Sequence, residues 1–407
     1  MIKYTIIVPT RNTAKDLVFT VKSILANKYE NFELIVSFNN MKVNNIKFLN
    51  KIKDKRLKIF FTPANFSMVK HYEWVLKKAK GEWVSIIGDD DAIVSNFFET
   101  IDEKMKIFYD KKIQAISINS SNYYYEGVQS VYGPTVFRYY NHDSTMIRDS
   151  RTNLIRVMLG LMPYQRLPGI YVSGVIKKDL IDKITKLSNN KFFHEPNPDV
   201  YSAIIISLFI KNYLRIEKPL FLVGTSKKSN AYKLIHELDK KRGRDPGNNI
   251  FISDSERDGY LISEKVPKFF WHSRLISAFL FSALFNAQKI IYKNNLISYF
   301  FFIIRVAVDL IDDKNFINKM NHEKSKKIFL GMLKNSFFLS NLVYFFSYFY
   351  FLFLKLMHYI NKNKIKVIIK LLYFQSIINI KFIKIIYLYS KNRKQYPNIY
   401  VASQFVL

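Results

Sequence analysis

The N-terminal part of the chain alternates short apolar runs with segments whose apolar residues recur at helical spacing. Tyr4–Val8 and Phe32–Val36 have the length and composition of buried strands. Between them, residues 16–26 carry their apolar side chains at the spacing of one helix face. A strand, a helix and a second strand within roughly thirty residues predict a βαβ unit with parallel strands and a right-handed crossover.

The same alternation continues through the first half of the chain. Further strands are expected at 57–61, 83–87, 113–118 and 219–224, and further helices at 66–80 and 200–210. This order predicts an α/β fold whose central sheet is mostly parallel. From residue 266 onward the pattern is apolar, aromatic and helical, which predicts an all-α C-terminal region.

Three consecutive carboxylates stand shortly after the apolar run at 83–87. Asp89, Asp90 and Asp91 repel one another and lose solvation when they are packed together, unless a cation neutralises them. Hard divalent ions such as Mg²⁺ or Mn²⁺ prefer carboxylate oxygens, and ligands of open α/β sheets bind at the carboxyl ends of the strands. These three residues alone are compatible both with a metal site and with a solvated acidic turn.

Five pieces of sequence, in this order and at these separations, resemble the family 2 glycosyltransferases, whose catalytic domain has the GT-A fold. The pieces are Ile7–Asn12, Phe32–Asn40, Asn65, Ala79–Trp83 and Gly88–Asp91. The resemblance ends near residue 230 and implies a GT-A, Rossmann-like domain over residues 1–235. It also implies transfer of a sugar from a nucleotide-sugar donor to an acceptor hydroxyl.

By this resemblance, the donor nucleotide lies at the ends of the first two strands. The residues implied to contact the donor are Pro9, Thr10, Arg11, Asn39, Asn65 and Asp89. The chain departs from the family pattern at two places. Ser37–Asn40 lacks the usual acidic residue, and His71–Glu73 stands where many members carry an arginine. The identity of the nucleotide is therefore open.

The resemblance also gives roles in the chemistry to particular aspartates. Asp90 is implied as the main metal ligand, with Asp91 at the metal or at the donor sugar, and the ion as Mn²⁺ or Mg²⁺. Such a cation offsets the negative charge that develops on a leaving nucleoside diphosphate. Asp199 is implied as the general base of an inverting transfer, with His194 and Glu195 as reserve candidates. Because Asp199 precedes an apolar helix, a capping role is the alternative.

Composition divides the chain into three parts. Residues 1–235 form the expected GT-A domain, and 236–265 have the Gly, Pro, Asn and Arg content of a linker or mobile loop. Residues 266–407 are basic and aromatic-rich, and we expect this helical region to associate with a membrane.

Two segments of the C-terminal part carry the membrane prediction. The uncharged run at 335–354 is just long enough to span a bilayer, but its Ser, Asn and Tyr content favours a helix that lies on the surface. Between residues 355 and 384, six lysines fall on one stripe of a continuous helix, which suits an anionic leaflet. A helical bundle whose lysines face water is the alternative.

The overall charge and the absence of cysteine narrow the class of protein. The formal net charge is +31, and no Asp or Glu occurs from Lys324 to Leu407, so the basic excess lies at the end of the chain. That location favours an anionic membrane surface as partner and no nucleic acid, because no nucleic-acid-reading module is recognisable. The lack of cysteine excludes disulfides and a thiol nucleophile. With only a short apolar run before Pro9, we expect a cytoplasmic protein, peripheral on the inner face of the cell membrane.

These features predict a metal-dependent, inverting glycosyltransferase. Its expected donor is a nucleotide-sugar, specifically a UDP-sugar, and its expected acceptor is a glycan or a lipid-linked molecule in surface polysaccharide or lipooligosaccharide assembly. The alternative is a non-catalytic glycan- or membrane-binding protein that retains the GT-A fold. Phe38 and the missing arginine motivate that alternative.

Overall fold

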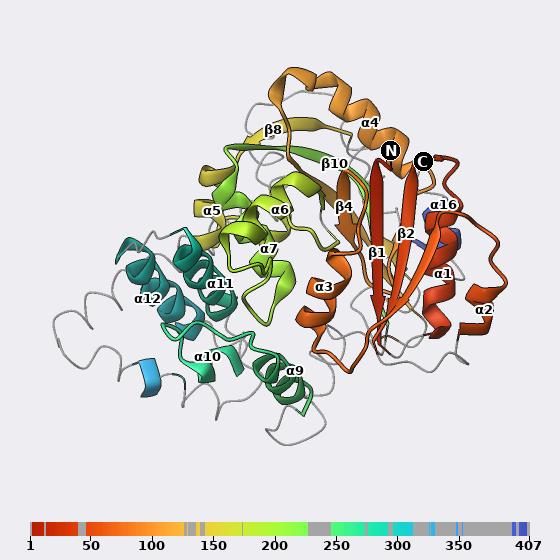
Figure 1. Ribbon diagram of the computed structural model, residues 1–407. Coiled ribbons are helices and arrows are strands. Elements are labelled where there is room, and N and C mark those ends of the chain that lie inside the picture. The colour runs from red at the N-terminus through yellow and green to blue at the C-terminus, as the bar shows by residue number, and fades with distance from the viewer. Residues whose placement is uncertain are drawn as a thin grey trace.

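A central sheet with helices on both of its faces forms the N-terminal part of the protein (Figure 1). The computed structural model describes residues 2–11, 14–39, 46–125, 143–172, 174–226, 246–272, 276–291 and 296–311, with shorter stretches at 128, 136–138, 325, 327–329, 347–348, 352, 393–395 and 399–404. The expected α/β fold is confirmed.

The sheet contains 11 strands within the described chain, and its main path has the order β11-β7-β6-β9-β4-β1-β2-β3. Four neighbouring strands pair in parallel, β1 (Tyr4–Thr10), β2 (Phe32–Phe38), β3 (Leu57–Phe61) and β4 (Trp83–Ile86), and so do β6 and β10, whose bounds follow. β9 (Gly174–Lys177) is antiparallel to both of its neighbours, β4 and β6 (Ala115–Tyr124). The remaining strands are β5 (Ala92–Ile93), β7 (Val136–Arg138), β8 (Thr145–Asp149), β10 (Asn212–Thr225) and β11 (Arg393–Gln395).

Strand β1 lies at the point where the strand order reverses. From β1 the chain moves outward to β2 and β3, and then returns to the other side of β1 as β4. In open α/β sheets, the carboxyl edge at such a reversal opens the crevice in which ligands bind. The carboxyl ends of β1 and β4 are therefore the expected place for a site.

The two faces of the sheet bury separate hydrophobic cores because side chains alternate along each strand. In β1, Tyr4, Ile6 and Val8 enter one core, and Ile7 enters the other. Helices α1 (Ala14–Leu25), α2 (Lys47–Asn50) and α4 (Phe97–Ile107) cover the first core. Helices α3 (Met68–Leu76), α5 (Ser150–Met158), α6 (Lys178–Leu187) and α7 (Pro198–Phe209) cover the second.

Four of the C-terminal helices extend the second core, and a fifth packs against the other face of the sheet. They are α9 (Pro246–Arg257), α10 (Lys268–His272), α11 (Ile276–Ile290), α12 (Leu296–Ile311) and α16 (Ile399–Gln404). Helix α11 packs against α7 and α12, whereas α16 packs against α1 on the far side of the sheet (Figure 1). The expected helical C-terminal region is thus present, with the short strand β11 in addition.

Strand β10 is longer than the pattern predicted. The expected strand began at Pro219, because proline lacks a backbone N–H and usually ends or starts a strand. In the structure β10 runs from Asn212 to Thr225 and accommodates the proline through shifts in its register with β6 between Ile216 and Phe221. Because the register shifts here, Pro219 does not have to donate a hydrogen bond to the neighbouring strand.

The expected linker at 236–265 contains a helix instead of a loop in its described part. Helix α9 begins at Pro246, because proline suits the first turn of a helix, where its missing N–H costs nothing. Residues 236–245 lie outside the described residues, so the domain boundaries stay predictions.

The membrane segments expected from the sequence lie almost wholly outside the described part of the chain. Of the run at 335–354, only residues 347, 348 and 352 are described, and the lysine stripe at 355–384 is not. No helix among the described residues combines the length and the apolarity needed to cross a membrane.

Candidate active site

The three aspartates lie in the loop that follows β4, beside the end of β1. The Thr10 hydroxyl, from the last residue of β1, donates a hydrogen bond to Asp89 Oδ2. Thr20 of α1 donates from Oγ1 to the carbonyl oxygens of Asp89 at 2.9 Å and Asp91 at 2.7 Å. The acidic loop is therefore attached to the carboxyl edge of β1 and to the first helix.

Asp91 is buried and holds the loop in shape. Its Oδ2 accepts a hydrogen bond of 2.6 Å from the Gly88 amide, and its Oδ1 accepts one of 2.8 Å from the Gly224 amide at the end of β10. Only 3% of Asp91 is exposed. Both oxygens thus bond to the backbone, which gives Asp91 a structural role whether or not it also binds metal.

Gly224 is required because β10 passes very close to the acidic loop. A Cβ atom at Gly224 would lie 1.7 Å from the carbonyl oxygen of Asp90, a distance that no side chain permits. The same carbonyl accepts a hydrogen bond of 3.1 Å from the Tyr125 hydroxyl. The backbone of Asp90 is therefore fixed from two strands.

The carboxylates carry negative charge that the protein does not fully compensate. Burial raises the pKa of Asp89 to about 7, and the neighbouring charge of Asp90 adds to the effect. Burial likewise raises the pKa of Asp90 to about 6, and it raises the pKa of Asp91 well above the usual range. A divalent cation would reverse this cost, because it favours the ionised form of each group.

Asp90 is the member of this cluster best placed to bind a metal ion. Its side chain is partly exposed, and its Oδ2 accepts a hydrogen bond of 3.1 Å from Ser226. No group of three or more acidic or histidine side chains among the described residues is arranged to hold an ion. A site with one or two carboxylates suits Mg²⁺, which is commonly completed by substrate phosphates and water.

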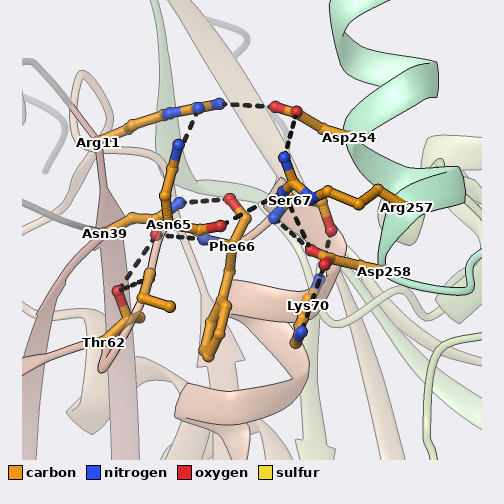
Figure 2. Close-up of polar contacts among 11 residues, drawn as sticks. Arg11, Asn39, Thr62, Asn65, Phe66, Ser67, Lys70, Asp254, Arg257 and Asp258 are labelled. Carbon is orange, nitrogen blue, oxygen red and sulfur yellow. Dashed lines mark hydrogen bonds and ion pairs between the residues drawn. The ribbon is translucent and has the colours of Figure 1, made fainter.

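The expected donor-binding residues Arg11 and Asn65 meet at the ends of β1 and β3. Arg11 Nη2 donates to Asn65 Oδ1 at 3.1 Å, and Arg11 Nη1 lies 3.3 Å from Asp254 Oδ2 of α9 (Figure 2). Pro9 is buried within β1, opposite Ser37 of β2. Arg11 therefore already has an anionic partner at the edge where a nucleotide is expected.

Asn39 holds the loop that carries Asn65. Its Nδ2 donates to the carbonyl oxygen of Phe66 at 2.7 Å, and its Oδ1 accepts from the Phe66 amide at 3.0 Å and from the Thr62 hydroxyl at 3.2 Å (Figure 2). Only 3% of Asn39 is exposed. The Asn39 side chain thus supplies the hydrogen bonds that hold this loop in place. Its expected contact with the base of the nucleotide stays a prediction.

Helix α9 is attached to this loop by an ion-pair network that the sequence did not indicate. Asp258, just after α9, accepts a 2.7 Å hydrogen bond from the Ser67 amide and lies 3.3 Å from Lys70 Nζ (Figure 2). Arg257 bonds to Asp254 at 2.9 Å and to the Asn65 carbonyl at 3.3 Å. The chain after residue 245 thus contributes to the edge of the candidate donor site.

Asp199 lies in the first turn of α7, and its two carboxylate oxygens differ in their surroundings. Its Oδ2 accepts a 2.6 Å hydrogen bond from the Tyr164 hydroxyl, whereas its Oδ1 is buried and has no hydrogen-bond partner among the described residues. Burial raises the pKa of Asp199 above its usual value, and backbone hydrogen bonds at Asp199 and Val200 lower it. The side chain of the N-cap residue Asn197 makes no cap, so a capping role for Asp199 stays the alternative to the role of base.

Two tyrosines lie near the acidic loop, Tyr72 buried and Tyr171 partly buried. The rings of Tyr72 and Tyr171 lie 5.7 Å apart, and a Cβ atom at Gly88 would meet the Tyr171 hydroxyl at 3.1 Å. Burial raises the pKa of both phenols, and the negative charges of Asp91 and Asp199 contribute in each case. The charges of the acidic loop and of Asp199 therefore both act on this pair of tyrosines.

Glu73 positions the segment that leads to Asp199. Its Oε2 accepts hydrogen bonds from the amides of Phe192 at 2.9 Å and Phe193 at 3.0 Å. Burial raises the pKa of Glu73, in spite of these bonds. The sequence signal for this role was the position of Glu73, a charged residue on the buried face of α3.

The two reserve candidates for the base are committed to the backbone. His194 Nε2 lies 3.1 Å from the carbonyl oxygens of both Ser188 and Lys191. Glu195 is fully buried, and its Oε2 accepts a 3.0 Å hydrogen bond from the Asn197 amide. Asp199 is bonded in a comparable way to Tyr164, so the assignment of the base stays a prediction, with His194 and Glu195 in reserve.

Comparisons with known proteins agree on one family for the N-terminal part. Residues 5–150 match the family model of glycosyl transferase family 2. An uncharacterized glycosyltransferase of Haemophilus influenzae is 34% identical over 96 residues, which are 23% of this chain and 38% of the relative. Glycosyltransferase GlyG of Streptococcus pneumoniae is 26% identical over 120 residues, 29% of this chain and 39% of the relative. The chain thus spans less than two fifths of either relative's length.

Solved structures of S. aureus TarS are similar to this chain at low sequence identity. Its fragment 1–349 in complex with UDP-GlcNAc is 14% identical, with a TM-score of 0.40, over 77% of this chain and 82% of that one. The complex with UDP is 16% identical, with a TM-score of 0.41, over 71% of this chain and 83% of that one.

Proposed function

Residues 5–150 belong to glycosyl transferase family 2, and from this premise we propose that the chain is a metal-dependent, inverting glycosyltransferase. Its donor would be a UDP-sugar, and its acceptor a glycan or lipid-linked molecule of surface polysaccharide assembly. The proposal is supported by one observation above all. The three carboxylates gather at the carboxyl ends of β1 and β4, where the strand order reverses, and the charges of Asp91 and Asp199 both act on the pair Tyr72 and Tyr171.

The chain's own residues would divide the work between two sides of this pair. On the donor side, Thr10 and Thr20 hold the acidic loop, and Asp90 would hold a Mn²⁺ or Mg²⁺ ion. The ion would supply charge neutralisation for the leaving diphosphate. On the acceptor side, Asp199 Oδ1 would accept the proton of the attacking hydroxyl, while Tyr164 keeps the carboxylate oriented. A single carboxylate is sufficient for a single displacement with inversion.

The expected place of action is the inner face of the cell membrane. This part of the proposal is supported by the charge distribution, because the acid-free stretch from Lys324 to Leu407 suits an anionic leaflet. Docking would confine the enzyme and a lipid-linked acceptor to one surface.

Donor binding is tested by the thermal stability of the purified protein with UDP, GDP, CMP and their sugars, each with and without Mn²⁺. A ligand that binds the native state raises its stability, so the expected result is stabilisation by UDP that requires the metal. No stabilisation by any nucleotide would favour the alternative, a non-catalytic glycan- or membrane-binding protein.

Two substitutions test the assignment of the aspartates. Asp90→Asn should abolish the metal-dependent part of UDP stabilisation, because an amide is a weaker ligand of hard cations. Asp199→Asn should leave UDP binding intact and lower the transfer rate by roughly 100-fold or more, the usual contribution of a general base. Asp110→Asn, at an exposed site, is the control. Full turnover by either active-site variant would show that its assigned role is wrong.

A further inference from the structure

A cavity lined by arginines lies beside the short turn that carries Tyr164. Its volume is about 410 Å³, and it lies between β8, α5, η3 (the 3-10 turn Tyr164–Arg166) and the start of β10. The polar side chains that line it are Arg148, Asn153, Arg156, Arg166, Tyr213 and Arg215. Four guanidinium groups therefore face one cavity of a size that suits a small ligand group.

The positive charge of this arginine pocket is only partly compensated. Glu217 pairs with Arg166 through Oε1 and with Arg215 through Oε2, the latter at 3.0 Å. No carboxylate of the described residues pairs with Arg148 or Arg156, and the bond from Arg156 to Asn153 is long, at 3.4 Å. One carboxylate thus stands against four guanidinium groups.

Arg215 is held in place by two neighbours and still has one donor atom without a partner among the described residues. Only 3% of Arg215 is exposed, its Nη1 donates to Ser117 at 2.9 Å, and its buried Nε has no hydrogen-bond partner in the described structure. Burial lowers the pKa of Arg215 in spite of its bond to Glu217, and the charge of Arg166 adds to this. A buried cation with an unused donor is costly unless an anion completes it.

A purely structural role explains only two of the four arginines, Arg166 and Arg215. The bonds among Arg166, Glu217 and Arg215 attach η3 to β10, and the Tyr213 hydroxyl strengthens this attachment with a 2.9 Å bond to the Arg166 carbonyl. Arg148 and Arg156 take no part in that network. Their presence at the same cavity favours a ligand with several anionic oxygens, since guanidinium groups bind phosphate in a bidentate manner.

The pocket adjoins the candidate base through η3. Tyr164, at the start of this short turn, bonds to Asp199, and Arg166, at its end, lines the pocket. A molecule that places a hydroxyl at Asp199 is thus close enough to extend an anionic group toward the arginines.

We propose that the arginine pocket binds a phosphate group that is covalently part of the acceptor, such as the diphosphate of a lipid carrier or a phosphodiester within a glycan. The assignment of the ligand as acceptor rests on the proposed transferase function, whereas the anion site itself does not. The acceptor would then be selected by its phosphate as well as by its sugar.

Binding of inorganic pyrophosphate, measured by calorimetry without divalent metal, tests the site. The native protein should bind one equivalent, and Arg148→Gln combined with Arg156→Gln should weaken binding by about tenfold or more, as expected for loss of charged hydrogen bonds to phosphate. Arg151→Gln is the matched control, because it removes the same charge from α5 at an exposed position outside the pocket.

The outcomes separate this inference from the proposed function. UDP stabilisation with Mn²⁺ should be the same in the double variant and in the native protein. If UDP binds to none of the proteins while pyrophosphate binding still depends on the two arginines, the pocket stands and the donor assignment falls.

Three results would overturn the inference. The first is no binding of pyrophosphate by the native protein, and the second is equal binding by the double variant and the Arg151 control. The third is arginine-dependent binding of phosphatidylglycerol vesicles without any binding of pyrophosphate, since the pocket would then recognise a membrane headgroup.

Discussion

Asp199 and Tyr164 together define the state of the candidate base. The Tyr164 hydroxyl stabilises the ionised carboxylate, and burial favours the protonated form. The two effects oppose each other, and burial is the larger, so the pKa of Asp199 lies above its usual value. A base with a raised pKa accepts a proton more readily at neutral pH.

Tyr164→Phe should therefore move the acidic limb of the pH–rate profile to higher pH. The variant loses the hydrogen bond that lowers the pKa of Asp199, while burial, which raises it, remains. The measurement is kcat/KM against pH for both proteins, with UDP stabilisation as the control for folding. An unchanged acidic limb, with only a lower plateau, would show that Tyr164 does not act through Asp199.

The candidate site was predictable from sequence where the chemistry is local. Consecutive carboxylates after a strand indicated the acidic loop, and two prolines before an apolar helix drew attention to Asp199. Tyr164, Tyr171 and Arg215 were not assigned roles, because their functions depend on partners far away in the chain. A tyrosine or arginine has no sequence pattern of its own that distinguishes such a role from ordinary packing.

At the scale of single elements, α3 connects the sheet to the chain after residue 245. On its inner side, His71 Nε2 lies 2.7 Å from the Ser37 hydroxyl of β2, and both residues are buried. At its N-terminus, Ser67 and Lys70 bond to Asp258. Helix α3 thus makes one contact, at His71, that involves a titratable group. It makes another, at its N-terminus, with a segment far away in the sequence.

His71 should make the protein less stable in mild acid. Burial lowers its pKa to about 4, and the charge of Arg11 adds to this, whereas an unfolded histidine titrates near pH 6.5. Between these values the unfolded state binds more protons, so stability falls as the pH drops from about 6.5 to 4, by up to about 3 kcal/mol. Denaturant titrations of the native protein and of His71→Gln over this range measure the effect. Equal pH slopes for both proteins would contradict it.

Asp258 should control the local stability of the 62–67 loop. Asp258→Ala removes the acceptor of the Ser67 amide, and because a hydrogen bond to a buried carboxylate contributes about 1.5–3 kcal/mol, exchange of that amide should accelerate about tenfold or more. Hydrogen exchange of peptides that cover residues 62–70 is the measurement. Glu256→Ala is the control, because Glu256 lies on the same helix and pairs with Lys268, away from the loop. Equal exchange in both variants would show that α9 does not hold the loop.

At the scale of the whole molecule, the periodicity of the sequence was enough to predict the central strands of the layered core. β1, β2, β3 and β4 lie where the apolar runs placed them. Three of them, β1, β2 and β4, are buried on both faces and so need apolar side chains at nearly every position, whereas β3 lies at the end of the strand order and is only partly buried. The strands β5, β7, β8, β9 and β11 were not predicted. They are short and partly polar, and pairing with distant strands determines them.

The helix α9 is an element that the sequence pattern did not predict. Its Asn, Gly and Asp content is typical of a loop, and tertiary contacts outweigh that preference. Bonds from Asp254, Arg257 and Asp258 attach it to the rim of the candidate donor site, so its conformation depends on residues nearly two hundred positions earlier in the chain.

The return of the chain end to the N-terminal domain has a mechanical consequence. β11 pairs with β7, and α16 packs on α1, while α12 is joined to the opposite side of the sheet through α11 and α7. The described segments that precede residue 312 and follow residue 392 therefore contact opposite faces of the same sheet. The acidic loop is held by α1, and α1 is in turn covered by α16, so substitutions in the last described helix should be felt at the candidate donor site.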